Sequence, residues 1–341
     1  MRNARAGLLW ALTVMIVASA TRNPLYILVV LLITTAVELA HTPRDHRGWP
    51  IALRFALIAI PLAALFNGLT VHLGETVLFR LPEWLPLLGG PVTAEALVYG
   101  ATNGLTLAVI FSGFATFNQA TPVRDLVRLT PRAFHEAGVV LSIALTFIPQ
   151  MKRNLARIRE AQAIRGHRVR GLRDWLPIFV PLLVGGLERA MGLAEAMVAR
   201  GYGATADRHT APRTQLLLAL GLMLLLLGWL VYLLLPQWHL AASGGMIAGV
   251  GLIGSVLWWA GRSVPHTTYR VQRWSIHESL VVLGCVLALT LVWAPWPFLN
   301  REALYYSAYP QLSLPPFDPI TGLGLLGLLV PALFAGSRMG K

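Results

Sequence analysis

The chain has 341 residues, of which 56% are hydrophobic and only 13% are charged. Soluble domains carry roughly 25% charged residues, so the composition argues against a soluble globular protein and against a disordered one. The formal net charge of +13 is large for so apolar a chain. It suits either nucleic acid or anionic lipid, and the positions of the charges decide between these partners.

Apolar stretches long enough to cross a membrane recur along the chain. A spanning helix needs roughly 20 mostly apolar residues, and the clearest stretch, 216–235, contains no charged residue. Trp and Tyr cluster near the ends of several stretches, as in interfacial aromatic belts. We therefore expect an all-α, polytopic helical membrane protein with about eight spans. The predicted spans are 7–20, 25–40, 51–67, 97–119, 216–235, 244–260, 277–295 and 321–336.

The first of these stretches has a second interpretation. Arg2 and Arg5, the apolar run and the small residues Ala18-Ser19-Ala20 resemble a cleavable signal peptide. Further apolar segments follow at once, which favours a retained first helix.

Lysine and arginine predict the orientation, because they concentrate in cytoplasmic loops. With a cytoplasmic N-terminus and eight crossings, 25 of the 28 basic residues lie in five cytoplasmic parts: 1–6, 41–54, 120–213, 261–276 and 337–341. Only Arg22, Arg80 and Arg301 fall outside them. This distribution predicts a bacterial or archaeal cytoplasmic (inner) membrane protein with both termini in the cytoplasm. It also explains the net charge without nucleic acid as a partner.

Residues 120–213 do not fit a span. Their two apolar stretches, Gly138–Pro149 and Leu176–Leu187, are about a dozen residues each, which suits a buried or interfacial helix. Basic residues flank the first stretch on both sides, so a single crossing would place one group on the wrong side. We expect 120–213 to be one cytoplasmic, membrane-hugging helical unit between a four-span bundle (1–119) and the C-terminal spans (214–341).

Two helices are predicted in this unit. The first begins near Thr130-Pro131, with Thr130 as N-cap, continues past Pro149 with a kink and ends at Ile164-Arg165-Gly166. Its residues Met151, Leu155, Ile158 and Gln162 mark one face. The second helix runs from about Asp174 to Ala199-Arg200-Gly201. In it, Gly186, Ala190 and Ala194 are small residues four apart, which permits a close helix crossing.

Both helices end on an arginine followed by a glycine, Arg165-Gly166 and Arg200-Gly201. Glycine accepts the left-handed conformation of a C-cap, and arginine complements the helix dipole. Simple capping explains one such end. Two of them in one cytoplasmic unit also favour docking, because an exposed guanidinium binds a partner's carboxylate well.

Four stretches carry a resemblance to a known family: Thr121-Pro122 with Asp125-Leu126; Val140-Leu141-Ser142 through Phe147-Ile148-Pro149; Ala161 to Gly166 (AQAIRG); and Glu188-Arg189-Ala190-Met191 through Ala196 to Gly203. The last stretch is the most specific. With them, the sequence resembles the transmembrane T component of energy-coupling factor (ECF) transporters, the family that includes the cobalt-transport Q proteins. The resemblance covers roughly residues 1–236.

The resemblance implies a function without catalysis. In this family two cytoplasmic ABC-type ATPases bind two arginine-tipped coupling helices, and their movement drives a small membrane S component that captures a vitamin or metal ion. By position, Arg165 and Arg200 match the two arginine motifs, with Ile164, Gly166, Ala199 and Gly201 beside them. The coupling helices would pack through Gly186, Glu188, Arg189, Ala190 and Ala194.

The sequence departs from the family in two places. Ile164 stands where the family more often has alanine. In addition, about 105 residues follow position 236. This tail is an added module, a fragment of a fused partner or lipid-facing apolar sequence; three spans are too few for the roughly six-helix S component.

Other chemistry is not indicated. The chain has no G-x-x-x-x-G-K-[ST] motif, so an ATPase would be a separate subunit. No cofactor or metal is expected: the nearest histidine pair, His41 and His46 with Asp45 between them, fits a solvated loop. Cys285 lies alone in an apolar run. The ionisable residues Glu38, Arg54 and Glu278 lie near span ends, where we expect their side chains to reach water.

Two other functions stay open. The first is a scaffold or assembly protein that binds anionic lipid or another membrane protein through 120–213, where eight basic residues and one acidic residue lie between Lys152 and Arg173. The second, which the sequence favours least, is a membrane-embedded enzyme.

Overall fold

The computed structural model describes residues 3–42, 48–82, 89–127, 129–130, 134–168, 171–202, 212–262, 274–294 and 301–334. The chain divides into two compact units, each described here by itself. Unit 1 combines Met1–Leu126 with Arg270–Lys341, and unit 2 is Val127–Tyr269. Within the described residues the fold is helical except for one two-stranded sheet.

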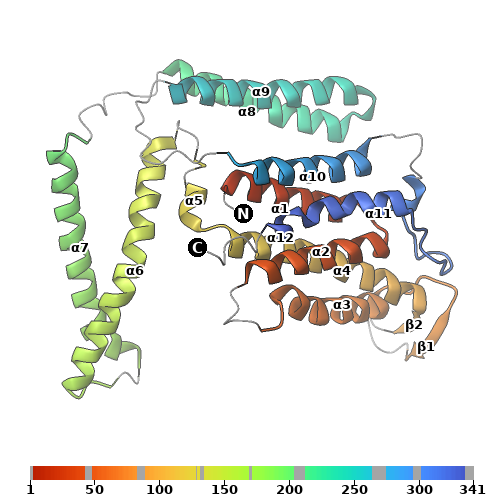
Figure 1. The fold of residues 1–341 in the computed structure, drawn as a ribbon, viewed down its shortest axis with the longest axis horizontal. Coiled ribbons are helices and arrows are strands. Elements are labelled where there is room, and N and C mark those ends of the chain that lie inside the picture. The colour runs from red at the N-terminus through yellow and green to blue at the C-terminus, as the bar shows by residue number, and fades with distance from the viewer. Residues whose placement is uncertain are drawn as a thin grey trace. The chain divides into compact units, whose positions relative to one another are not determined.

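Unit 1 contains both ends of the chain (Figure 1). Its elements are α1 (Ala4–Ala20), α2 (Pro24–His41), α3 (Ile51–Thr70), β1 (Val77–Leu81), β2 (Gly90–Thr93), α4 (Ala94–Ala120), α5 (Val123–Val127, which ends at the boundary), α10 (Ile276–Trp293), the 3₁₀ turn η5 (Arg301–Leu304), α11 (Pro319–Leu325), the 3₁₀ turn η6 (Leu326–Leu329) and α12 (Val330–Leu333). Unit 2 holds α6 (His135–Ile164), the 3₁₀ turn η3 (Leu172–Trp175), α7 (Leu176–Ala199), α8 (Pro212–Leu234), the 3₁₀ turn η4 (Pro236–Trp238) and α9 (His239–Arg262).

The core of unit 1 joins helices from both ends of the chain. Trp10 of α1 and Tyr26 of α2 are fully buried with Cys285 of α10. The indole Nε1 of Trp10 donates a hydrogen bond to the Leu328 carbonyl at 2.9 Å. The side-chain amide of Asn23, which caps α2, donates to two carbonyls of the C-terminal segment. The C-terminal helices are therefore part of the core that α1 and α2 begin.

Predicted spans and observed helices agree closely. Among the described residues, seven helices are long and apolar enough to cross a membrane, and six of them match predicted spans: α2, α3, α4, α8, α9 and α10. α1 is apolar but only 17 residues long. The seventh candidate, Arg173–Ala199, includes α7 and qualifies by length and composition alone. The chain is a polytopic helical membrane protein.

The last predicted span, 321–336, is not one continuous helix. The described part is divided into α11, the 3₁₀ turn η6 and α12. Gly322, Gly324 and Gly327 weaken the helix here, and Pro331 removes a backbone donor. Gly327 packs so closely against Gly284 of α10 that a Cβ on Gly284 would collide with the Gly327 carbonyl. This backbone contact explains why the segment keeps small residues at the expense of regular helix.

The expectation that Glu38 and Glu278 reach water is wrong, because both carboxylates are buried. Glu38 is only 2% exposed, and its oxygens accept hydrogen bonds from the backbone amides of Ile51 and Ala52 at the start of α3. Glu278 is 5% exposed and accepts from the Ser275 amide in a capping box. Orphan amides at a helix N-terminus supply the donors that water would otherwise provide. Arg54 is exposed, as expected.

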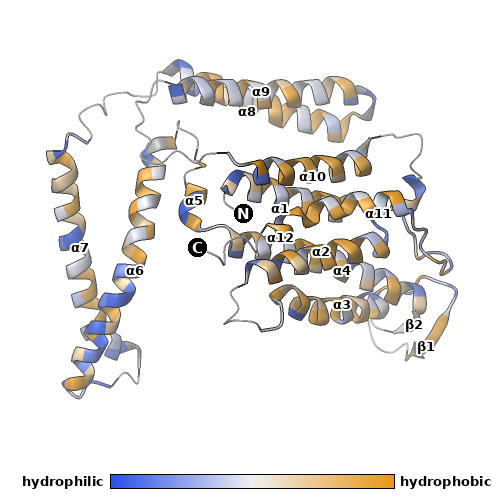
Figure 2. Cartoon of the chain, viewed as in Figure 1, coloured by the Kyte–Doolittle hydropathy of each residue, from blue (hydrophilic) through white to orange (hydrophobic). Residues whose placement is uncertain are grey.

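In unit 2, α8 and α9 pack through glycines. A Cβ on Gly249 would lie 2.8 Å from the Gly221 carbonyl oxygen, and one on Gly228 would lie 2.9 Å from the Ala242 oxygen. Small residues let the two backbones approach, as is common between membrane helices. The outward side chains of both helices are largely apolar and exposed (Figure 2).

Candidate functional site on helices α6 and α7

Helices α6 and α7 form an antiparallel, crossed pair (Figure 1). They meet at Gly186, where a Cβ would collide with the side-chain tip of Met151. Further along, the side-chain amide of Gln162 donates to the Pro177 carbonyl at 3.4 Å. Residue numbers rise on α6 as they fall on α7, so the C-terminal end of α6 lies beside the N-terminal end of α7.

The four residues that were predicted to share one face of α6 are the ones that are partly shielded from solvent. Met151, Leu155, Ile158 and Gln162 are half-buried. The basic residues between them are exposed: Lys152, Arg153, Arg157 and Arg159. The helix passes through Pro149 without a break, as predicted, but it begins at His135, later than expected. Thr130 precedes it, and Pro131 lies outside the described residues.

The connection between the helices is held by its own contacts. The His167 ring nitrogen Nε2 lies 2.7 Å from the Asp174 carbonyl oxygen. The Asp174 carboxylate accepts from the Gly171 amide at 2.9 Å. The Arg159 guanidinium lies 6.0 Å from the centre of the Trp175 ring, within range of a cation–π interaction. These contacts fix the end of α6 relative to the start of α7.

Both helices end in the same hydrogen-bonded motif. On α6, the His167 amide donates to the Gln162 carbonyl and the Gly166 amide donates to Ala163, both at 2.9 Å. On α7, the Tyr202 amide donates to Met197 at 3.0 Å and the Gly201 amide to Val198 at 2.9 Å. These are the two bonds of a Schellman motif. The glycines have φ values of +80° and +78°, so the predicted left-handed C-caps are confirmed.

Both caps are open to solvent in the described chain. Ile164 is 88% exposed, and Arg165, Gly166, Ala199, Arg200 and Gly201 are all exposed. A Cβ on either glycine would meet nothing within 4 Å. Neither guanidinium has a hydrogen bond or an ion pair among the described residues. Within the described part of the chain, the two arginine-tipped ends therefore share one backbone geometry and the same exposure to solvent.

The other predicted site residues lie on α7. Gly186 is buried at the crossing, while Ala190 and Ala194 are exposed, so only the first of the three forms the close approach to α6. Glu188 and Arg189 are exposed, and the Arg189 Nε donates to the Gly185 carbonyl at 3.0 Å. The sequence showed the small residues but not which of them would face α6.

Helix α7 also carries an exposed apolar stripe. Leu187, Met191 and Val198, which recur at helical spacing, are 57–71% exposed. Leu176, Phe179, Val180, Leu183 and Val184 extend the apolar surface toward the N-terminus and are also exposed. Figure 2 shows the complementary pattern on α6, whose hydrophilic residues gather in its C-terminal half. The pair thus combines an apolar surface with basic residues.

Comparison with known proteins identifies the family. The family model of the cobalt transport protein CbiQ matches residues 2–212. The chain belongs to this family. The matched region includes α1–α7 and both arginine-tipped ends, whereas α8–α12 follow it.

Three proteins with similar sequences share one name. "Energy-coupling factor transporter transmembrane protein EcfT" of Streptococcus equi is 29% identical over 45% of this chain and 68% of its own length. The protein of the same name from Heliobacterium modesticaldum is 29% identical over 52% of this chain and 76% of its own. That of Exiguobacterium sibiricum is 37% identical over 27% of this chain and 41% of its own. These similarities, with the family match, support a membrane component of an ECF transporter.

Proposed function

We propose that the chain is the transmembrane coupling (T) subunit of an ABC-type ECF importer. It receives ATP-driven movement from two cytoplasmic ATPases and passes it to an S component that takes up a vitamin or a metal ion. The chain has no catalytic role; the ATPase partners hydrolyse ATP. The observation that carries the proposal is the pair of identical, solvent-open caps at Arg165 and Arg200.

The chemistry of the caps supports a docking role. A Schellman motif fixes the direction of the last turn, so the arginine that precedes each glycine leaves the helix at a defined place. An arginine offers a planar fork of donors to a carboxylate. Within the described residues, a partner that binds either guanidinium breaks no existing contact of that group.

The location of α6 and α7 follows from their charges. α6 carries Lys152, Arg153, Arg157, Arg159 and Glu160 in its C-terminal half. Each charge at the centre of a bilayer costs roughly 2.5–3.5 kcal/mol or more. We therefore place 120–213 on the cytoplasmic surface, with the apolar stripe of α7 facing lipid or the S component. Both chain termini then lie on the same, cytoplasmic, side.

The decisive experiment reverses both charges. The chain is produced together with two ATPases and an S component of an ECF transporter, and ATP-dependent uptake is measured in cells. Arg165→Glu with Arg200→Glu adds repulsion where alanine would remove only attraction. We expect the ATPases to be lost on purification and uptake to fall at least tenfold, while the protein stays in the membrane. Arg153→Glu with Arg157→Glu, on the same helix pair but away from the caps, is the matched control.

Normal uptake in the cap variant would reject this function. Loss of uptake with both variants, together with salt-sensitive binding of the protein to anionic vesicles and no bound ATPase, would instead favour a scaffold that uses 120–213 to bind anionic lipid.

A further inference from the structure

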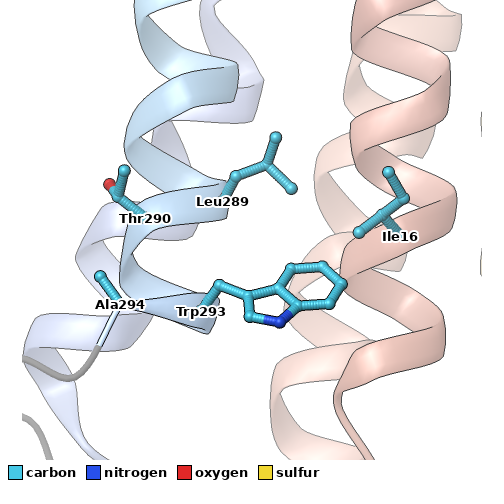
Figure 3. Close-up of a pocket in the computed structure, with 5 residues that line it drawn as sticks. All are labelled: Ile16, Leu289, Thr290, Trp293 and Ala294. Carbon is cyan, nitrogen blue, oxygen red and sulfur yellow. The ribbon is translucent and has the colours of Figure 1, made fainter. Parts of the chain in front are cut away.

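An amphipathic pocket lies between α1 and α10 in unit 1. It has a volume of about 750 Å³. Its apolar wall includes Leu12, Ile16 and Val292, and its rim includes the aromatic residues Trp293 and Tyr305. A second hollow of about 450 Å³ shares Ile16 and Trp293 and adds Leu289. Figure 3 shows Trp293 projecting from α10 toward Ile16 on α1.

Two arginines line this pocket from distant parts of the chain. Arg22 lies between α1 and α2, and its backbone amide donates to the Leu304 carbonyl at 3.1 Å. Arg301 opens η5, and its guanidinium donates to the Trp293 carbonyl at the end of α10. Both side chains are exposed, and none of the described residues that line the pocket is acidic. Positive charge therefore gathers at one end of an apolar groove.

These arginines are also exceptions to the charge distribution of the whole chain. Only Arg22, Arg80 and Arg301 fall outside the basic parts that are predicted to be cytoplasmic. Basic residues are uncommon on the far side of a membrane protein, and two of the three meet at one pocket. The aromatic residues beside them, Trp293 and Tyr305, are 60% and 64% exposed, as suits headgroup depth.

We propose that this groove binds an anionic phospholipid, with an acyl chain along Ile16 and Leu289 and the headgroup phosphate between the guanidiniums of Arg22 and Arg301. Charge complementarity selects the headgroup, because arginine pairs with phosphate through two parallel hydrogen bonds. The apolar wall selects an amphiphile over a free anion. The site lies in the leaflet opposite to the cytoplasm and does not depend on the proposed coupling function.

The test uses the full-length protein, purified in detergent and analysed by native mass spectrometry. Phosphatidylglycerol and phosphatidylcholine with identical acyl chains are added at equal concentration. We expect the wild type to prefer phosphatidylglycerol by about tenfold or more, since each surface arginine contributes substantially to anionic lipid binding. Arg22→Gln with Arg301→Gln should abolish this preference, and Arg22→Lys with Arg301→Lys should largely retain it.

Two controls separate this site from general effects. Arg80→Gln removes the third outward arginine, which is exposed on β1 and does not line the pocket, and should leave the preference unchanged. Ile16→Trp fills the groove and should weaken binding of both lipids at least fivefold, whereas Leu8→Trp, elsewhere on α1, should not.

The proposal is overturned if the glutamine pair keeps the wild-type preference, or if Arg80→Gln reduces it equally. It is also overturned if millimolar inorganic phosphate displaces the lipid, because the site would then recognise a free anion.

Discussion

The buried side chain of Asn23 joins the N-terminal and C-terminal parts of unit 1. Asn23 is fully buried and makes three hydrogen bonds: its oxygen accepts from the Leu25 amide, and its nitrogen donates to the carbonyls of Ala303 and Pro316 at 2.7 and 2.6 Å. One asparagine thus caps α2 and ties it to residues almost three hundred positions away. In a low-dielectric interior, an unsatisfied carbonyl is costly.

We therefore expect Asn23→Ala to lower the free energy of unfolding by about 2–4 kcal/mol, because it removes the cap and leaves two carbonyls unpaired. The matched control is Asn3→Ala. Asn3 caps α1 with one bond to the Arg5 amide at 3.1 Å, so its loss should cost about 1 kcal/mol. Denaturant unfolding in detergent, followed by circular dichroism, measures both. Equal losses would show that the two C-terminal bonds contribute nothing.

The cap glycines permit a second test at this scale. Gly166→Ala with Gly201→Ala places side chains at positive φ, which costs roughly 1 kcal/mol at each site. The last turns should fray, and co-purification of the ATPases should fall several-fold. Gly192→Ala, mid-helix on α7 with open space around it, should leave binding unchanged. Full ATPase recovery with the double variant would show that cap geometry does not position the arginines.

At the scale of elements, small residues determine which helices pack closely. In α9, a Cβ on Gly249 would lie 2.9 Å from the Leu225 amide nitrogen of α8, whereas one on Gly251 would meet nothing within 4 Å. Both glycines lie two residues apart in the same helix. Only one of them faces the neighbouring backbone.

Gly249→Val should therefore separate α8 from α9 and lower the thermal unfolding midpoint by several degrees, since neither backbone can yield as a flexible side chain would. Gly251→Val, with the same change in composition, should leave the midpoint within about one degree. Differential scanning fluorimetry on the purified protein compares them. Similar midpoints for both variants would contradict the packing.

Features that depend on local sequence are predictable, whereas features that depend on tertiary packing are not. Helix ends follow local chemistry, so the ends of α6 and α7 at Arg165 and Arg200 are predictable from an arginine and a glycine. Partners depend on tertiary packing, so the sequence does not predict that Glu38 caps α3 or that Ala190 faces solvent. The sequence does not predict the β1–β2 hairpin, because its strands are short, at five and four residues. The span pattern is predictable because the bilayer fixes its length.

On the scale of the whole molecule, unit 1 is completed only by the C-terminal segment. α10 packs on α1, and Leu328 accepts the hydrogen bond of the buried Trp10 indole. The residues beyond the family match therefore include a structural part of the N-terminal core.

A chain shortened to residues 1–269 should lose the packing of α10 on α1 and the hydrogen bond between Trp10 and Leu328. We expect it to accumulate at less than about a tenth of the wild-type level in membranes, because Trp10 and Tyr26 lose their partners. Co-expression of 270–341 as a separate chain should restore part of the level. Quantitative blotting of membrane fractions measures the outcome, and normal accumulation of the shortened chain would show that the C-terminal segment is dispensable for folding.

The antiparallel crossing of α6 and α7 has a geometric consequence. Arg165 lies fourteen residues beyond Met151 on α6, and Arg200 lies fourteen residues beyond Gly186 on α7, so the two caps are equally far along the chain from the contact between these residues. Two related proteins, one at each cap, would therefore encounter the same backbone geometry, because both caps have the same hydrogen bonds and nearly the same glycine φ. Any discrimination between them must come from the residues that break the equivalence, Ile164 against Ala199 and His167 against Tyr202.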